Sequence, residues 1–115
     1  MLRRVVLIAC TGALVAATAA FARPAASPPS GLYGCVIGSD SIYAGDLRIL
    51  DGSHYRLNQS KVGVFVSRGH RLTFPSGVFA KLVKGRWYRT TEGRFEIALT
   101  SLKSGFTSEY CTQEK

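Results

Sequence analysis

Two histidines and an aspartate stand beside glycines in the middle of this 115-residue chain. His54 follows Asp51-Gly52 closely, and His70 directly follows Gly69. If two turns met at one rim, these side chains would offer donors of the kind that zinc accepts. A zinc site takes three or four protein ligands, however, and two imidazoles on turns are usually just exposed. We therefore predict no metal site and no cofactor.

Glu92 and Glu96 come nearest to a pair of catalytic carboxylates. They stand among Arg86, Arg89 and Arg94, so cross-strand ion pairs are the simpler interpretation. Serines are plentiful, but no histidine and carboxylate are placed to activate one. The sequence also lacks H-E-x-x-H, C-x-x-C, a phosphate-binding loop, a dinucleotide fingerprint and G-x-S-x-G. We predict no catalytic residues and no enzymatic activity, and a hydrolase or metal-dependent enzyme is the third hypothesis behind the two given below.

Residues 1–22 have the features of a secretory signal peptide. Arg3 and Arg4 precede an apolar run over residues 5–21, and residues 20–22 form an A-x-A cleavage site. This pattern predicts export, to the periplasm or out of the cell, with no transmembrane segment left after cleavage.

Residues 7–10 also resemble a bacterial lipobox, in which Cys10 would become a lipidated N-terminus. The apolar stretch before Cys10 is shorter than the ~7–15 residues of a usual h-region, and the apolar run continues beyond it. Lipidation at Cys10 is therefore the alternative, and cleavage after residue 22 is the prediction.

Cleavage would leave an even pair of cysteines, Cys35 and Cys111. Such a pair in an exported protein predicts a disulfide. Two free thiols or a metal pair are the alternatives, but no further cysteine and no histidine lies close to either residue in sequence. The bond would enclose nearly the whole domain, so the first and last strands would have to meet.

The chain is basic, with a formal net charge of +8 before cleavage. Residues 68–94 concentrate this charge, since they contain seven lysines and arginines and only one acid, Glu92. One interpretation is a solvated face that keeps a small domain soluble. The other is a docking surface for an anionic envelope polymer, lipid headgroups or an acidic protein. No nucleic-acid partner is expected.

The stretch 47–74 contains one pattern twice, with apolar residues five and three places before a glycine and three and five places after it. This alternation is typical of half-buried strands, and the glycine marks a hairpin turn. In the first copy, a three-residue loop at 50–52 pairs Leu47 with Tyr55 and leaves one face apolar. Its glycine would take positive φ, which glycine adopts without strain.

The second copy follows the same scheme. A loop at 67–69 pairs Val64 with Leu72 and Val66 with His70, which again gathers the apolar side chains on one face. A slip of one residue would turn them to water, so the register should be well specified.

The remaining elements complete an all-β domain over residues 31–115, preceded by a flexible Pro/Ala/Ser leader at 23–30. A third hairpin turns at 91–93, and residues 78–83 suit either a helical turn or a short strand. Sequential hairpins predict an antiparallel meander of about eight short strands, closed as a small barrel or a two-layer sandwich.

Two aromatic residues break the alternation of their strands. Phe65 and Tyr88 have the opposite parity to Val64, Val66 and Trp87, so they would point outward beside arginines. Exposed aromatics with arginines are typical of contact surfaces, although a two-layer fold would bury both. The candidate binding surface consists of Phe65, Arg68, Arg71, Arg86, Tyr88 and Arg89.

The segments at 31–35, 45–55 and 72–77, with the late Cys111, resemble small secreted bacterial β modules that are loosely lipocalin-like. Their shared pattern is G-x-Y-x-C, G-x-L-x-I, L-T-F-x-S-G and a final cysteine. The resemblance implies a β fold and export, and it brings no catalytic residues. The leading hypothesis is an exported, non-enzymatic binding module that contacts an envelope component or a protein, for example as an enzyme inhibitor. The alternative is a small-ligand carrier with an apolar cavity in the barrel.

Overall fold

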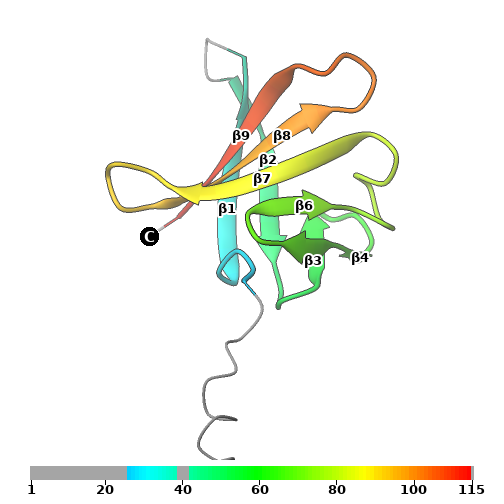
Figure 1. Cartoon of the computed structure of the whole chain (residues 1–115), viewed down its shortest axis with the longest axis horizontal. Coiled ribbons are helices and arrows are strands. Elements are labelled where there is room, and N and C mark those ends of the chain that lie inside the picture. Colours follow the sequence, from blue (N-terminus) through cyan, green and yellow to red (C-terminus); the bar gives the residue numbers. More distant parts are fainter. Residues whose placement is uncertain (1–25, 39–41, 115) are drawn as a thin grey trace, which may run out of the picture.

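The computed structural model describes residues 26–38 and 42–114, and every regular element within them is a β-strand (Figure 1). The predicted signal peptide and Cys10 lie outside the described residues. No helix in the described ranges is long and apolar enough to cross a membrane. The strands are β1 (Gly31–Ile37), β2 (Ile42–Ile49), β3 (His54–Leu57), β4 (Gly63–Val64), β5 (Val66–Arg68), β6 (Arg71–Thr73), β7 (Val83–Arg89), β8 (Phe95–Ser101) and β9 (Thr107–Gln113).

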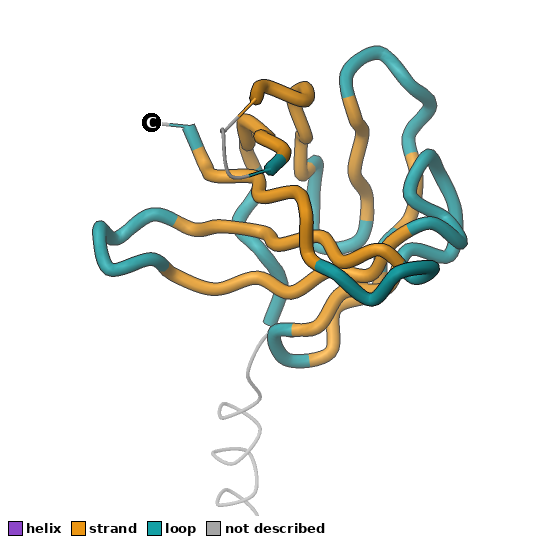
Figure 2. The backbone as a smooth tube through the Cα atoms, turned by 90° about the horizontal axis from the view of Figure 1, so that it is seen from above, coloured by secondary structure: helices purple, strands orange, loops and turns teal. Residues whose placement is uncertain are grey.

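One antiparallel sheet of nine strands, in the order β4-β3-β2-β1-β9-β8-β7-β6-β5, curls into a nearly closed barrel (Figures 1 and 2). Only Phe65 separates the two outermost strands, β4 and β5, along the chain. The predicted antiparallel all-β fold is confirmed, with nine strands instead of about eight. Because all the strands belong to one sheet that curls on itself, the barrel alternative describes it better than the sandwich.

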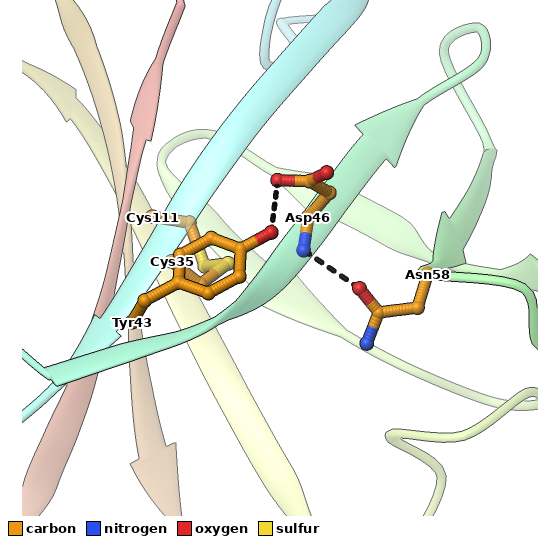
Figure 3. Close-up of a disulfide and its surroundings, with 5 residues drawn as sticks. All are labelled: Cys35, Tyr43, Asp46, Asn58 and Cys111. Carbon is orange, nitrogen blue, oxygen red and sulfur yellow. Dashed lines mark hydrogen bonds between the residues drawn. A yellow bond between two sulfur atoms is a disulfide. The ribbon is translucent and has the colours of Figure 1, made fainter.

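The first and last long strands, β1 and β9, are neighbours in this sheet, and Cys35 lies directly opposite Cys111. The two cysteines form a disulfide and are fully buried (Figure 3). This confirms the predicted bond and the meeting of the ends of the meander. The disulfide also indicates an oxidising, exported environment.

Large side chains fill the interior of the barrel. Large inward-facing side chains recur at every second position of the long strands, as period two requires, and the largest fully buried ones come from strands across the whole sheet. They are Tyr33, Tyr55, Phe65, Leu47, Leu72, Ile97 and Leu99.

In the first hairpin the apolar face was predicted correctly, but the register was wrong. Leu47 lies opposite Leu57 and Ile49 opposite Tyr55, because the loop comprises 51–53, one residue later than predicted. The Asp51 carboxylate accepts a hydrogen bond from the Ser53 N–H at 2.8 Å, so the turn begins at the aspartate. Moving the loop by one residue shifts the pairing by two, which leaves the same side chains inward.

In the second hairpin both the register and the predicted apolar face were wrong. Ser67 lies opposite Leu72, and the turn has two residues, Gly69 and His70. The strand that was expected to run unbroken into this hairpin is interrupted at Phe65, because β4 pairs with β3 whereas β5 pairs with β6. The alternation restarts there, so Phe65 points into the core and Val66 is exposed.

The third hairpin has the predicted register, with Trp87 opposite Ile97. Thr90 and Arg94 close its loop through an N–H to carbonyl hydrogen bond of 2.7 Å. The ambiguous residues 78–83 are neither a helix nor a separate strand. Residues 78–82 form turns, and β7 begins at Val83.

The described part of the proline-rich leader, residues 26–30, is held against the barrel. Pro28 is fully buried, and the Tyr33 hydroxyl donates a hydrogen bond to the Pro29 carbonyl at 2.7 Å. The flexible leader expected at 23–30 is thus anchored at its C-terminal end, because the proline ring supplies apolar surface that the barrel buries.

The two hairpin glycines are expected to respond differently to substitution. Gly69 has φ of 61°, so Gly69→Val should lower the free energy of unfolding by ~1–3 kcal/mol. Gly52 is not among the residues with positive φ, and a Cβ there would come no closer than 3.7 Å to Ser27 Oγ. Gly52→Val should therefore cost less than Gly69→Val in urea unfolding. Equal losses would contradict the two turn conformations.

Candidate functional site

Three arginines form a row across the outer face of the barrel. Arg68 on β5 lies opposite Arg71 on β6, and Arg71 lies opposite Arg86 on β7. All three are exposed, while the alternate residues Leu72 and Trp87 point into the core. Like charges directly opposite each other destabilise a sheet. The one ion pair among residues 26–38 and 42–114 joins Asp51 to His54, so no carboxylate there neutralises this row.

The arginine row borders a depression of about 460 Å³, which we call the basic groove. It is lined by Arg71, Leu72, Thr73, Lys84, Gly85, Arg86, Ala98, Thr100 and Thr107. Three of these residues are cationic, three are threonines and none is acidic. Ala98 lies opposite Arg86 on one side and Tyr110 on the other, so a small side chain leaves room between two large ones.

This lining can hold an oxyanion. Arginine presents a planar fork of N–H donors that matches carboxylate, sulfate or phosphate oxygens, and lysine adds a mobile point charge. The hydroxyls of Thr100 and Thr107 lie 2.7 Å apart and share a hydrogen bond, so one of them keeps its O–H free to donate to a ligand.

The predicted binding surface is only partly assembled. Arg68, Arg71 and Arg86 come together in the row, and the half-buried Tyr88 lies next to them with the Arg86 guanidinium 5.8 Å from its ring centre. Arg89 belongs to the β7–β8 hairpin instead, where its guanidinium stacks 4.9 Å from the centre of the Phe95 ring.

Phe65 was placed wrongly on this surface. It is a core residue with 1% exposure, because the break between β4 and β5 turns it inward.

Lys84 and the three threonines of the groove were not predicted. Lys84 alternates with Arg86 along β7, so strand parity alone was a sufficient signal for it. Thr100 and Thr107 reach the groove only because β8 and β9 pair beside β7, which no local pattern indicates.

A second depression, of about 380 Å³, is lined by residues of β1, β2, β3 and the turn after β3, and it provides a contrast. It also contains two directly opposed arginines, Arg48 and Arg56. Asp46 lines the same depression and accepts a hydrogen bond from the Tyr43 hydroxyl at 2.7 Å (Figure 3). A negative charge from the chain itself therefore already lies beside this arginine pair.

The two histidines occupy separate sites. His54 Nδ1 lies 2.9 Å from the Asp51 carboxylate, whereas His70 Nδ1 lies 2.8 Å from the Trp87 carbonyl. Hydrogen bonds from Ser53 and His54 lower the pKa of the exposed Asp51 carboxyl. Among the described residues, the one cluster with three metal-type donors is Cys35, Glu109 and Cys111. Its two sulfurs are joined in the disulfide, so they cannot act as thiolate ligands.

The expected ion pairs of Glu92 and Glu96 with arginines do not form in the described part of the chain. Glu96 lies opposite Tyr88 on β7, and Glu92 is exposed in the hairpin loop. Strand pairing thus gives Glu96 a phenol as its cross-strand neighbour.

Glu109 should make stability depend on pH. It lies opposite Ile37 and Leu99 beside the disulfide, and burial raises the pKa of its carboxyl. The folded state then keeps a proton that the unfolded chain releases. The free energy of unfolding should therefore fall as pH rises from about 4.3, the ordinary glutamate pKa, through the raised folded value.

Glu109→Gln should remove that part of the pH dependence. Chemical unfolding of both proteins between pH 4 and pH 8 measures it, and Glu92→Gln in the exposed loop is the control. A wild-type pH profile retained by Glu109→Gln would contradict the assignment.

The fold and groove together define a small disulfide-bonded β-barrel with a cationic outer face. In comparisons with known proteins, no family model, no curated protein and no solved structure matches this chain.

Proposed function

We propose that this protein is an exported, non-enzymatic binding module that holds an anionic component of the cell envelope in the basic groove. The observation that carries the proposal is the row of Arg68, Arg71 and Arg86. Three like charges on directly opposed positions repel one another and destabilise the sheet, and a bound anion would offset that repulsion. The periplasm or the outside of the cell would be its place of action.

The size and composition of the groove support a polymer or headgroup more than a simple ion. A volume of about 460 Å³ is within the ~300–1,000 Å³ range of sites for drug-sized ligands, and its cations lie on two strands. Contacts that are mainly electrostatic would be weakened by salt, since the Debye length is ~10 Å at 0.1 M.

The alternative of a small-ligand carrier requires an apolar cavity inside the barrel. Aromatic rings of Tyr33, Tyr55 and Phe65 occupy the interior instead and are fully buried. This packing favours the binding module over the carrier, and an enzyme inhibitor with an acidic target would use the same groove.

Binding of fluorescent dextran sulfate, with neutral dextran as the blank, tests the proposal. Arg71→Gln with Arg86→Gln should weaken binding by roughly tenfold or more, because a charge-assisted hydrogen bond contributes roughly 1.5–3 kcal/mol. Arg48→Gln with Arg56→Gln is the matched control, since it also removes two charges from an opposed arginine pair beside a depression.

If the groove is specific, the control variant Arg48→Gln with Arg56→Gln should bind dextran sulfate within about twofold of wild type. These substitutions change only the overall charge of the protein and its long-range field. If both double variants lost the same affinity for dextran sulfate, the polymer would be responding to net charge alone. If Arg71→Gln with Arg86→Gln bound dextran sulfate with wild-type affinity, the groove would be rejected as the site.

A further inference from the structure

Two tight loops at one end of the barrel carry exposed apolar side chains. The first comprises residues 78–82, before β7, and the second comprises residues 102–106, between β8 and β9 (Figure 1). We call them the tip loops. Leu82 is 59% exposed, Leu102 is 52% exposed and Phe106 is 75% exposed.

A backbone hydrogen bond holds the tip loops side by side, since the Leu102 N–H donates to the Leu82 carbonyl at 2.9 Å. A second one, from the Ser101 N–H to the Phe106 carbonyl at 3.1 Å, closes the loop at 102–106. The apolar side chains are therefore displayed by ordered turns, and their exposure is part of the fold. Clustered large apolar side chains in water mark a surface that contacts something else.

Two further exposed apolar side chains lie at the end of β1 and the start of β2. Ile37 and Ile42 lie opposite each other there, and both are exposed. The Gly38 N–H donates to the Ser108 carbonyl at 3.0 Å, which places this end beside the start of β9.

The tip loops and the residues that flank them carry charge of one sign, and the nearest carboxyl on β9, that of Glu109, lies opposite Ile37 and Leu99. Segments 78–84 and 101–108 contain Lys81, Lys84 and Lys103 and no acidic residue. All three lysines are exposed. Lysines around protruding apolar side chains suit a membrane interface, because their long stems reach past the apolar layer to lipid phosphates.

The basic groove opens beside the tip loops. Lys84 and Thr107 line the groove, and in the chain they follow Leu82 and Phe106 within two residues. A headgroup in the groove would therefore have its acyl chains next to the apolar tips.

We propose that this end of the barrel docks on an anionic lipid surface, with Leu82, Leu102 and Phe106 entering the interface and the basic groove holding a headgroup phosphate. The headgroup part rests on the proposed function. Charge complementarity favours lipid over a second copy of the chain, since two copies would bring lysines against lysines. Each basic side chain near an anionic membrane strengthens such binding.

Sedimentation of the exported protein with lipid vesicles tests the inference. Vesicles of phosphatidylcholine with 30% phosphatidylglycerol are compared with pure phosphatidylcholine, and the protein should bind the anionic vesicles at least tenfold more tightly. Leu102→Ser with Phe106→Ser should weaken vesicle binding at least tenfold and leave dextran sulfate binding unchanged. Leu50→Ser with Val62→Ser, two exposed apolar residues outside the tip loops, is the control and should bind vesicles as wild type does.

The outcomes separate the two proposals. Wild-type vesicle binding by the tip variant would overturn membrane docking and leave the proposed function standing. Retention of dextran sulfate binding by Arg71→Gln with Arg86→Gln would instead overturn the groove. Equal binding of wild type to both vesicle types would overturn the assignment of an anionic surface.

A Phe106→Trp variant reports insertion directly. Its fluorescence should shift to the blue on anionic vesicles and be quenched by brominated lipid, with no shift on dextran sulfate. Trp87, which is largely buried, supplies a constant background. An unshifted spectrum on vesicles that bind the protein would overturn insertion of the tip.

Discussion

Cys35→Ala with Cys111→Ala should lower the free energy of unfolding by about 4.5 kcal/mol, the chain-entropy value for a loop of this length. The two residues are separated by 76 positions, so the bond restrains nearly the whole unfolded domain. Alanine avoids placing hydroxyl groups at two fully buried positions. Urea unfolding of the oxidised wild type, the reduced wild type and the double variant measures the effect.

The reduced wild type and the double variant should lie close together, and added reductant should leave the variant unchanged. The barrel itself should survive, because the pairing of β1 with β9 also includes Tyr33 with Gln113 and Ile37 with Glu109. The bond would be contradicted by two reactive thiols in each natively exported chain. It would also be contradicted if the double variant and the oxidised wild type unfolded at the same urea concentration.

Tyr55→Ala is the side-chain substitution with the second largest expected effect, a loss of ~3–5 kcal/mol in the free energy of unfolding. The ring is fully buried, stacks on Phe79 at 5.3 Å and meets the edge of Phe74 at 5.1 Å. Its hydroxyl donates to the Ser76 carbonyl at 2.8 Å and accepts from the Phe79 N–H at 2.9 Å. This one side chain therefore holds the segment 74–79 against β3, next to β4, where the Val64 N–H donates to the Ser76 hydroxyl.

Tyr55→Phe separates the two contributions. It keeps the ring but leaves the buried Phe79 N–H and the partly buried Ser76 carbonyl without their partner, which should cost ~1–3 kcal/mol. Tyr43→Ala is the control, because Tyr43 is 64% exposed and surface substitutions usually change stability by ~0.5 kcal/mol or less. A Tyr55→Ala protein as stable as Tyr43→Ala would show that the ring is not part of the core.

Gly63 and Gly77 explain why the tyrosine fits. A Cβ at Gly77 would lie 2.5 Å from the Tyr55 hydroxyl, and one at Gly63 would lie 2.7 Å from its ring and from the Gly77 backbone. The two glycines let the chain pass directly over the phenol, which makes both hydrogen bonds of its hydroxyl possible.

Local alternation was enough to predict the first and third hairpins as strands with the correct inward faces, because side-chain direction within an unbroken strand depends on the neighbouring residues. Leu47 and Tyr55 face inward as predicted, and the third hairpin has its expected register of Trp87 opposite Ile97. Cysteine count and predicted compartment likewise predicted the disulfide, since Cys35 and Cys111 are the pair left after the predicted removal of Cys10.

The turn registers were less accessible to sequence. Asp51 bonds to Ser53 and so begins its turn one residue later than the glycine pattern predicted. Phe65 is a larger difference, because its inward direction results from the passage of the chain between the two ends of the sheet. That passage depends on how the whole sheet curls, and no window of neighbouring residues contains it.

The candidate site belongs mainly to the tertiary structure. The sequence by itself determined that the charge concentrates at 68–94, because composition is local. Only strand pairing decided that Arg71 and Arg86, fifteen positions apart, lie opposite each other. The same pairing brings Thr100 and Thr107 to the groove, since contacts between strands are set by the register of the sheet and by its closure.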